Sequence, residues 1–147
     1  MAFNVLTDHT IMLNVSPDSP RIEAICGSTT MTVGTLVKWN SSSELVIHAT
    51  ADAPAQKIFA VENANDGIQA ADAYVTGDNV IAYNMRPGDL IYAWLEAGET
   101  TYIGEFLTSA GGGLLHSPVA ATIGSYVCVS KQALTAVGNR LIEVEIL

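Results

Sequence analysis

Short apolar runs, separated every few positions by glycine and small polar residues, restrict what this chain can fold into. The run 90–95 (LIYAWL) follows a turn at 86–89 (RPGD), and the run 141–146 (LIEVEI) alternates apolar and acidic residues. A period of two is typical of a strand with one buried face, whereas a helix repeats its apolar residues every three or four positions. The pattern predicts an all-β protein.

The remaining runs extend this interpretation along the chain. We expect strands over 32–39, 44–48, 56–61, 79–84, 90–95, 100–103, 126–129 and 141–146. Helix is plausible only within 62–73 and as one turn near 131–136, and neither segment has the length or the caps to build a helical layer. Regular turn signals between short strands predict a single-domain β-sandwich or β-barrel with short hairpins.

Two segments depart from the regular pattern. Residues 62–78 form one long irregular excursion rich in Asn, Asp, Ala and Gly, and Pro17 and Pro20 interrupt the first twenty residues. Long excursions in compact domains are usually functional or ordered by a neighbour. We therefore divide the chain into an arm or edge segment, 1–20, and a single β domain, 21–147. The first segment either packs on another subunit or adds an edge strand.

An internal duplication would explain a similarity between the two halves. Residues 33–36 (VGTL) precede a small-residue turn and His48, and residues 103–106 (IGEF) precede the glycines 111–113 and His116. The spacing from each histidine to the next apolar run is equal. A repeated β unit would place the two histidines equivalently, but hairpins with Gly and Ser turns also resemble one another by chance, and both explanations remain open.

The composition favours association with other proteins. Hydrophobic residues make up 49% of the 147 residues and charged residues 14%, whereas charged residues are about a quarter of a typical soluble domain. Large exposed apolar patches usually mark interaction sites. The net charge of −9, with six basic residues spread singly, argues against nucleic acid or an anionic membrane as a partner.

Enzymatic motifs are missing from the sequence. None of the three histidines has a second histidine, cysteine or carboxylate at metal-ligand spacing within its own segment, so we expect no metal and no cofactor. There is no GxSxG motif, and the glycines 111–113 precede an apolar strand signal and predict a tight turn rather than a phosphate-binding loop. The sequence predicts a protein that is not an enzyme.

The two cysteines and the start of the chain bear on where the protein is made. Cys26 and Cys128 lie among apolar or small residues, without a second thiol nearby, and we expect two buried free thiols. The start of the chain (MAFNVLTDHTIML) has no basic segment followed by a long apolar run, which argues against a signal peptide, and no stretch approaches the ~20 apolar residues of a membrane span.

The order of several segments resembles the head decoration, or cement, proteins of tailed bacteriophages. After the Gly-x-Leu-Val run at 34–37 and His48, the segments that carry the resemblance are IFAVEN at 58–63, GIQAADAYVTGDNV at 67–80, RPGDLIYAWLEAGE at 86–99, IGEFLTSAGGGLL at 103–115 and RLIEVEIL at 140–147. The resemblance covers residues 22–147. Gly113 departs from it, since an acidic residue is expected within that turn.

This resemblance implies a β-sandwich or β-barrel protein that assembles as a homotrimer on the outside of an icosahedral head. The expected function is that of a structural virion protein, made in the cytoplasm of the host bacterium, which binds the major capsid protein and stabilises the head by non-covalent contacts. An alternative is a phage tail or fibre-associated β module that binds host glycans. That role would need Trp39 and Trp94 at the surface, whereas we expect them in the core or an interface.

Three regions are candidate contact surfaces: the N-terminal arm, the 62–78 excursion and the 86–89 turn. The individual candidates within or beside them are Phe3, Leu6, Ile11, Leu13, Ile68, Tyr74, Arg86 and Asp89.

Overall fold

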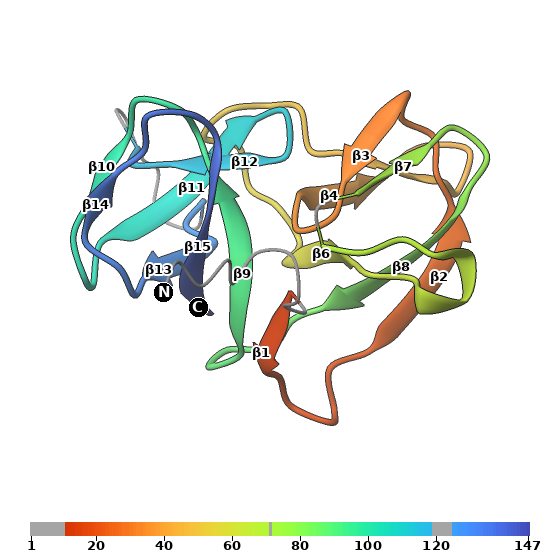
Figure 1. Ribbon diagram of the computed structural model, residues 1–147, viewed down its shortest axis with the longest axis horizontal. Coiled ribbons are helices and arrows are strands. Elements are labelled where there is room, and N and C mark those ends of the chain that lie inside the picture. Colours follow the sequence, from red (N-terminus) through yellow and green to blue (C-terminus); the bar gives the residue numbers. More distant parts are fainter. Residues whose placement is uncertain (1–10, 71, 119–124) are drawn as a thin grey trace, which may run out of the picture.

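The computed structural model describes residues 11–70, 72–118 and 125–147, and these residues are built almost entirely of β-strands (Figure 1). The predicted all-β class is confirmed. Within the described ranges, the helical element is a single 3-10 turn, η1, at Ala64–Asp66. Neither segment considered for an α-helix contains one among its described residues. The first holds η1 and ends where strand β7 (Ala73–Val75) begins, and the second holds strand β14 (Leu134–Thr135). No helix in the described part of the chain is long and apolar enough to cross a membrane.

The first half of the chain forms a five-stranded barrel. Its strands are β2 Arg21–Ile25, β4 Leu36–Trp39, β5 Leu45–Ile47, β6 Ile58–Val61 and β8 Asn79–Asn84, in the order β2-β8-β6-β4-β5. A parallel bridge between Cys26 and Leu45 joins the two ends of this order and closes the barrel. Strands β3 Thr30–Thr32 and β7 Ala73–Val75 pair as a separate two-stranded ribbon.

The second half repeats this arrangement. Its strands are β9 Leu90–Leu95, β11 Phe106–Gly111, β12 Leu114–His116, β13 Cys128–Ser130 and β15 Arg140–Ile146, in the order β9-β12-β11-β13-β15, with β9 also paired to β15. The β9–β12 pairing is parallel, as is the closing bridge of the first barrel. Strands β10 Thr100–Thr101 and β14 Leu134–Thr135 form the matching ribbon. Figure 1 shows the two barrels side by side.

Strand for strand, β2 to β8 correspond to β9 to β15, and the registers agree as well. The pair Leu36–Phe59 between β4 and β6 matches the pair Phe106–Val129 between β11 and β13. This agreement supports the internal duplication rather than a chance similarity of hairpins. The expected equivalence of the two histidines is wrong, because His116 pairs with Thr108 in the position where Val46 pairs with Lys38.

The predicted strands at 79–84 and 90–95 are confirmed at both ends. The strand predicted over 32–39 is wrong in one respect, because residues 33–35 turn from ribbon strand β3 into barrel strand β4. Gly34 has a φ of +95° in this turn, a conformation that side chains with a Cβ rarely adopt. Apolar periodicity continues across the turn, which is why the sequence pattern did not show it.

The start of the described chain adds to the second barrel. Strand β1, Met12–Asn14, pairs antiparallel with the beginning of β9 at the edge of the sheet. For these residues the edge-strand alternative is the one observed. Phe3 and Leu6 lie outside the described residues.

Buried hydrophobic side chains from both barrels form one continuous cluster. Cys26 and Cys128 are free and buried within it, as predicted. Burial raises the pKa of the Cys128 thiol, which keeps this sulfur protonated and unreactive.

Candidate interaction surfaces

The predicted contact residues are placed very differently from one another. Among those described, Leu13 is 38% exposed, Arg86 is exposed and Ile68 is half-buried against the core. Ile11, Tyr74 and Asp89 are buried within the subunit. The assignment of these last three as contact residues is corrected, because a partner cannot reach their side chains.

Tyr74 belongs to the fold of the first barrel. Its hydroxyl donates a hydrogen bond to the carbonyl oxygen of Val61 at 2.6 Å and its ring is fully buried. Burial raises the pKa of Tyr74 to about 12. The 62–78 excursion that carries Tyr74 is therefore held in place by the chain itself. Strand β7 pairs with β3, and Asn63 and Ile68, on either side of η1, form an antiparallel β-bridge.

Asp89 ties the N-terminal segment to the turn before β9. Its Oδ2 accepts hydrogen bonds from the Ser19 hydroxyl at 2.6 Å and from the Arg86 amide at 2.8 Å, and its Oδ1 accepts one from the Ser16 amide at 2.8 Å. Three partners satisfy the carboxylate inside the protein. The turn at 86–89 is thus a structural junction, from which the Arg86 side chain extends along the surface to the carbonyl oxygen of Asp18.

Several exposed apolar side chains lie outside the predicted contact regions. They are Ile25 at 46% exposure, Trp39 at 40%, Tyr102 at 63%, Ile103 at 66%, Phe106 at 49% and Val137 at 97%. Phe106 packs its ring against Tyr126, with ring centroids 5.2 Å apart. Sequence periodicity missed these residues because it reports which side chains alternate, not which barrel face is covered. Trp94 is half-buried against the core, as expected, whereas Trp39 is more exposed than expected.

The β11–β12 hairpin of the second barrel packs against the first barrel. The Leu36 amide donates to the carbonyl oxygen of Gly113 at 3.0 Å, and the Gly113 amide donates to that of His48 at 3.0 Å. The Asp52 amide donates to the carbonyl oxygen of Ser109 at 2.8 Å. Backbone hydrogen bonds of this kind fix the distance between the barrels. We call the contact, formed by the 109–113 segment with residues 33–36 and 48–52, the barrel junction.

Glycine at the hairpin tip permits this approach. A Cβ on Gly111 would lie 2.8 Å from the carbonyl oxygen of Ala49, and one on Gly113 would lie 2.8 Å from the Cβ of Thr35. Both distances are too short for any side chain. The predicted tight turn at 111–113 is observed, and two of its glycines also serve the junction.

His48 is a buried polar residue of the junction. Its Nδ1 lies 2.7 Å from the Ser109 hydroxyl and its Nε2 lies 3.4 Å from the carbonyl oxygen of Pro54. Burial lowers the pKa of His48, an effect that the Pro54 carbonyl partly opposes. The imidazole therefore favours its neutral form, as a hydrogen-bonded core residue does.

His116 is held by a carboxylate that reaches it from the first barrel. Its Nε2 lies 2.8 Å from Oδ1 of Asp52, which also accepts a hydrogen bond from the Thr108 hydroxyl at 2.8 Å. The hydrogen bond from Thr108 lowers the pKa of Asp52 most, and the hydrogen bond with His116 lowers it further. This group of three side chains is a second set of polar contacts across the junction.

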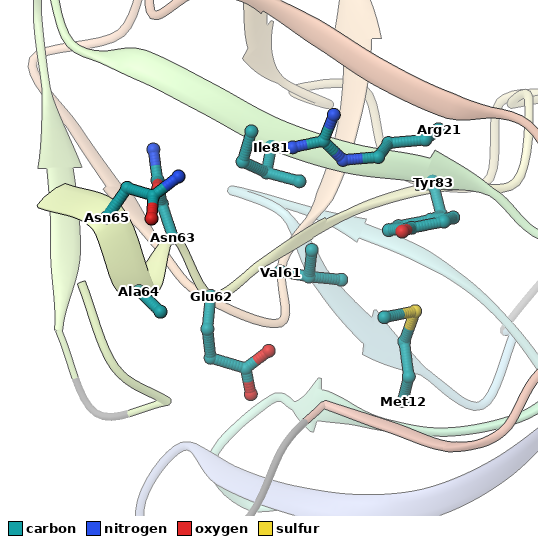
Figure 2. Close-up of a pocket in the computed structure, with 9 residues that line it drawn as sticks. All are labelled: Met12, Arg21, Val61, Glu62, Asn63, Ala64, Asn65, Ile81 and Tyr83. Carbon is teal, nitrogen blue, oxygen red and sulfur yellow. The ribbon is translucent and has the colours of Figure 1, made fainter. Parts of the chain in front are cut away.

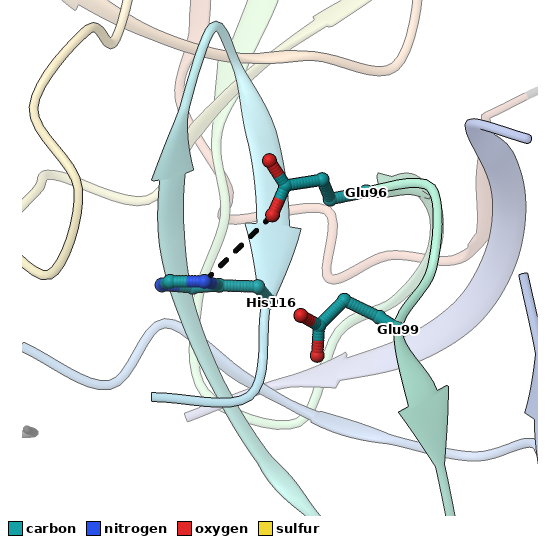
Figure 3. A group of neighbouring side chains, drawn as sticks. All are labelled: Glu96, Glu99 and His116. Atoms are coloured by element: carbon teal, nitrogen blue, oxygen red, sulfur yellow. Dashed lines mark ion pairs between the residues drawn. The ribbon is translucent and has the colours of Figure 1, made fainter. Parts of the chain in front are cut away.

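Two glutamates approach the other side of His116 (Figure 3). Ligand-type atoms of Glu96, Glu99 and His116 all lie within 4.8 Å of one another, and Nδ1 of His116 is 3.8 Å from Glu96 Oε2. The three come from the end of β9, the following turn and β12, so spacing within one segment did not reveal them. Such a set could hold a divalent cation, although three partly exposed ligands fall short of the four that close a structural zinc site. The absence of a metal remains a prediction.

A groove of about 240 Å³ lies beside β1, lined by Met12, Arg21, Glu62, Tyr83 and their neighbours (Figure 2). Glu62 is its half-buried acid, and partial burial raises its pKa. Its Oε1 accepts a hydrogen bond from the Ile11 amide, so this carboxylate holds the N-terminal segment on the barrels. Arg21 forms an exposed ion pair with Glu23. The groove therefore lies where the segment leading into β1 is attached to the first barrel, and its acid serves that attachment.

Comparison with known proteins gives a structural match. No family model matches the chain, and no curated protein matches it. Among solved structures it is similar to the N base of the head fibre protein gp8.5 of bacteriophage phi29, with a TM-score of 0.57 and 14% sequence identity over 88% of this chain and 94% of that one. At this identity the match shows a shared fold. The similarity extends over both barrels, since it spans nearly the whole chain.

Proposed function

We propose that this chain is a structural protein of a phage virion, a decoration protein that binds the outside of the head. One observation carries the proposal: nearly the whole two-barrel fold is shared with the base of a protein described as a phage head fibre. The order of sequence segments that resembles head decoration proteins supports it independently. In this proposal the partner is the major capsid protein, and the protein has no catalytic role and no cofactor.

The exposed apolar side chains support binding to other proteins. Burial of apolar area contributes about 25 cal/mol per Å², from which the cost of association must be subtracted. A modest contact repeated at every lattice site would stiffen a head under internal pressure. The acidic charge of −9 suits a protein on the outside of the shell, away from packaged DNA.

The test is to add the purified protein to heads that lack it. We expect saturable co-sedimentation with the heads and a higher temperature of heat-induced DNA release. Leu13→Ser, at an exposed position of β1, should weaken head binding, while Val137→Ser, at a more exposed position outside the predicted contact regions, should not. Heads that neither bind the protein nor gain heat resistance would overturn the proposal.

A fibre-associated module that binds host glycans is the second candidate, and the exposure of Trp39 favours it. An exposed indole ring is a typical platform for a sugar ring. If this function holds, the protein binds glycans of the host surface and Trp39→Ala abolishes that binding without lowering the melting temperature. Head binding that survives Trp39→Ala, without any glycan binding by the parent protein, would leave the decoration role as the function.

A further inference from the structure

The two barrels of one chain contact each other through different surfaces. The first barrel contributes the turn after β3 and the start of β4, where Val33 and Leu36 are fully buried. The Val33 carbonyl oxygen accepts a hydrogen bond from Trp94 Nε1 at 2.7 Å. The second barrel contributes Trp94 and the β11–β12 hairpin, including the buried Ser109. We call these the turn face and the hairpin face. The junction joins the turn face of one barrel to the hairpin face of the next.

Each barrel also carries the equivalent of the face that it does not use in the junction. On the second barrel, Ile103 and Phe106 occupy the turn-face positions of Val33 and Leu36. The pairs Leu36–Phe59 and Phe106–Val129 establish this register, and Gly34 and Gly104 have φ of +95° and +92° in the two turns.

On the first barrel, Ile25 and Trp39 occupy the hairpin-face positions of Trp94 and Ser109. Trp39 pairs with Leu45 as Ser109 pairs with Leu115. The parallel pairs that close the two barrels are Cys26–Leu45 and Leu95–Leu115. They place Cys26 at the position of Leu95, and therefore Ile25 at the position of Trp94. The hairpin turns also agree, since Ser43 has a positive φ of 61° where Gly113 has 75°. Ser43 carries a Cβ where the junction has a glycine, so a contact between copies is less close at the hairpin tip than the junction is and rests on the apolar side chains beside it.

These unused positions carry exposed apolar side chains. Ile103 and Phe106 are 66% and 49% exposed, whereas Val33 and Leu36 are fully buried. Ile25 and Trp39 are 46% and 40% exposed. The chain therefore presents an unpaired turn face at one end of the duplication and an unpaired hairpin face at the other. Within the chain, the junction already pairs one turn face with one hairpin face.

We infer that copies of this chain associate head to tail, with Ile25 and Trp39 of one copy against Ile103 and Phe106 of the next. The occupant is a second copy because the chain already contains both halves of the contact and has joined them once. Because the two faces differ, the contact is heterologous, and it closes into a ring or continues as a filament.

The two unpaired faces carry charges of opposite sign. Lys38 lies at the position of Thr108, which reaches across the junction to Asp52. Glu105 lies at the position of Thr35, which the hairpin tip approaches at Gly113. The opposite signs of Lys38 and Glu105 reduce the repulsion between two chains that each carry −9, although the two residues lie at different positions of the facing surfaces.

The inference is tested by sedimentation of the full chain over a range of concentrations, with no phage heads present, so that its outcome is independent of the proposed function. The parent protein should form oligomers. Replacing the turn-face pair (Ile103→Ser with Phe106→Ser) or the hairpin-face pair (Ile25→Ser with Trp39→Ser) should weaken association at least tenfold. Val75→Ser and Val137→Ser remove exposed apolar side chains at other positions and should leave the oligomers unchanged.

Mixing the two double variants distinguishes a head-to-tail contact from a symmetric one. Each variant retains one intact face, so each alone should be a monomer, and the mixture should form dimers of one copy of each and nothing larger. Unchanged melting temperatures show that the variants are folded. A parent protein that stays monomeric at high concentration, double variants that still associate, or a mixture that yields no mixed dimer would each overturn the inference.

Discussion

The indole Nε1 of Trp94 in the second barrel donates a hydrogen bond of 2.7 Å to the carbonyl oxygen of Val33 in the first. This bond links the hairpin face to the turn face. Trp94→Phe removes the donor while it retains an aromatic ring, and leaves a buried carbonyl oxygen without this partner. We expect a loss of about 1–3 kcal/mol in the free energy of unfolding, measured by urea denaturation. No loss would mean that the bond does not stabilise the barrel junction.

The glycines of the hairpin tip provide a matched pair of variants. Gly111→Ala adds a Cβ that would lie 2.8 Å from the Ala49 carbonyl oxygen, whereas Gly112→Ala adds one with no atom within 4 Å. Both residues have positive φ, so both variants incur the backbone cost of about 1–2 kcal/mol. Gly111→Ala should be destabilised further, because the hairpin must move away from the first barrel. Equal melting temperatures for the two variants would contradict the close approach.

His48 should make the protein less stable in mild acid. Burial lowers its pKa in the folded state from the ordinary value of 6.5, so the unfolded chain binds a proton more readily than the folded one. The contribution of His48 is fully present above about pH 6.5 and is lost as pH falls from there toward the folded pKa. We expect the melting temperature to drop between about pH 7 and 5, and to drop less for His48→Gln. Parallel pH profiles of the two proteins would refute the assignment.

Tyr74→Phe tests whether this residue acts inside the subunit. The change removes a buried hydroxyl that donates to the Val61 carbonyl at 2.6 Å. We expect a loss of about 1–2 kcal/mol in stability by chemical denaturation, with the oligomeric state and head binding unchanged. An effect on association at unchanged stability would restore Tyr74 as a contact residue.

Chelation should not affect the protein. Glu96, Glu99 and His116 provide three ligand-type atoms, and the Glu96 side chain is 40% exposed, so a cation there would keep much of its water. We expect the melting temperature to be the same with EDTA as with added zinc or calcium. A rise with zinc that Glu99→Gln abolishes, and that Glu23→Gln on the other barrel leaves intact, would instead establish a metal site.

The sequence predicted the strands that its local pattern defines. The alternation in 90–95 follows from side chains that point in turn to the barrel interior and away from it, and the burial along β9 alternates accordingly. The break inside 32–39 was missed because Val33, between two strands, is as apolar and as buried as the strand residues around it. Buried free thiols at Cys26 and Cys128 followed from their apolar neighbours.

The contact residues were harder to predict, because burial and partner groups come from distant parts of the chain. Asp89 was predicted as a contact residue of the 86–89 turn, but Ser16 and Ser19 bind its carboxylate inside the subunit. Glu96 and His116 meet only because β9 and β12 are neighbouring parallel strands where the second barrel closes. Hydrogen bonds and contacts between residues so far apart in the chain leave no periodic signal.

The sequence by itself determined the strand-forming runs, the turns that glycine permits and the similarity between VGTL at 33–36 and IGEF at 103–106. Only the tertiary structure decided that Val33 and Leu36 are buried while Ile103 and Phe106 are exposed. Local pattern sets the backbone conformation through steric limits and hydrogen bonds between neighbours. Whether an apolar side chain is covered depends instead on which surface docks against it, and here the second barrel covers one copy of the repeat and leaves the other open.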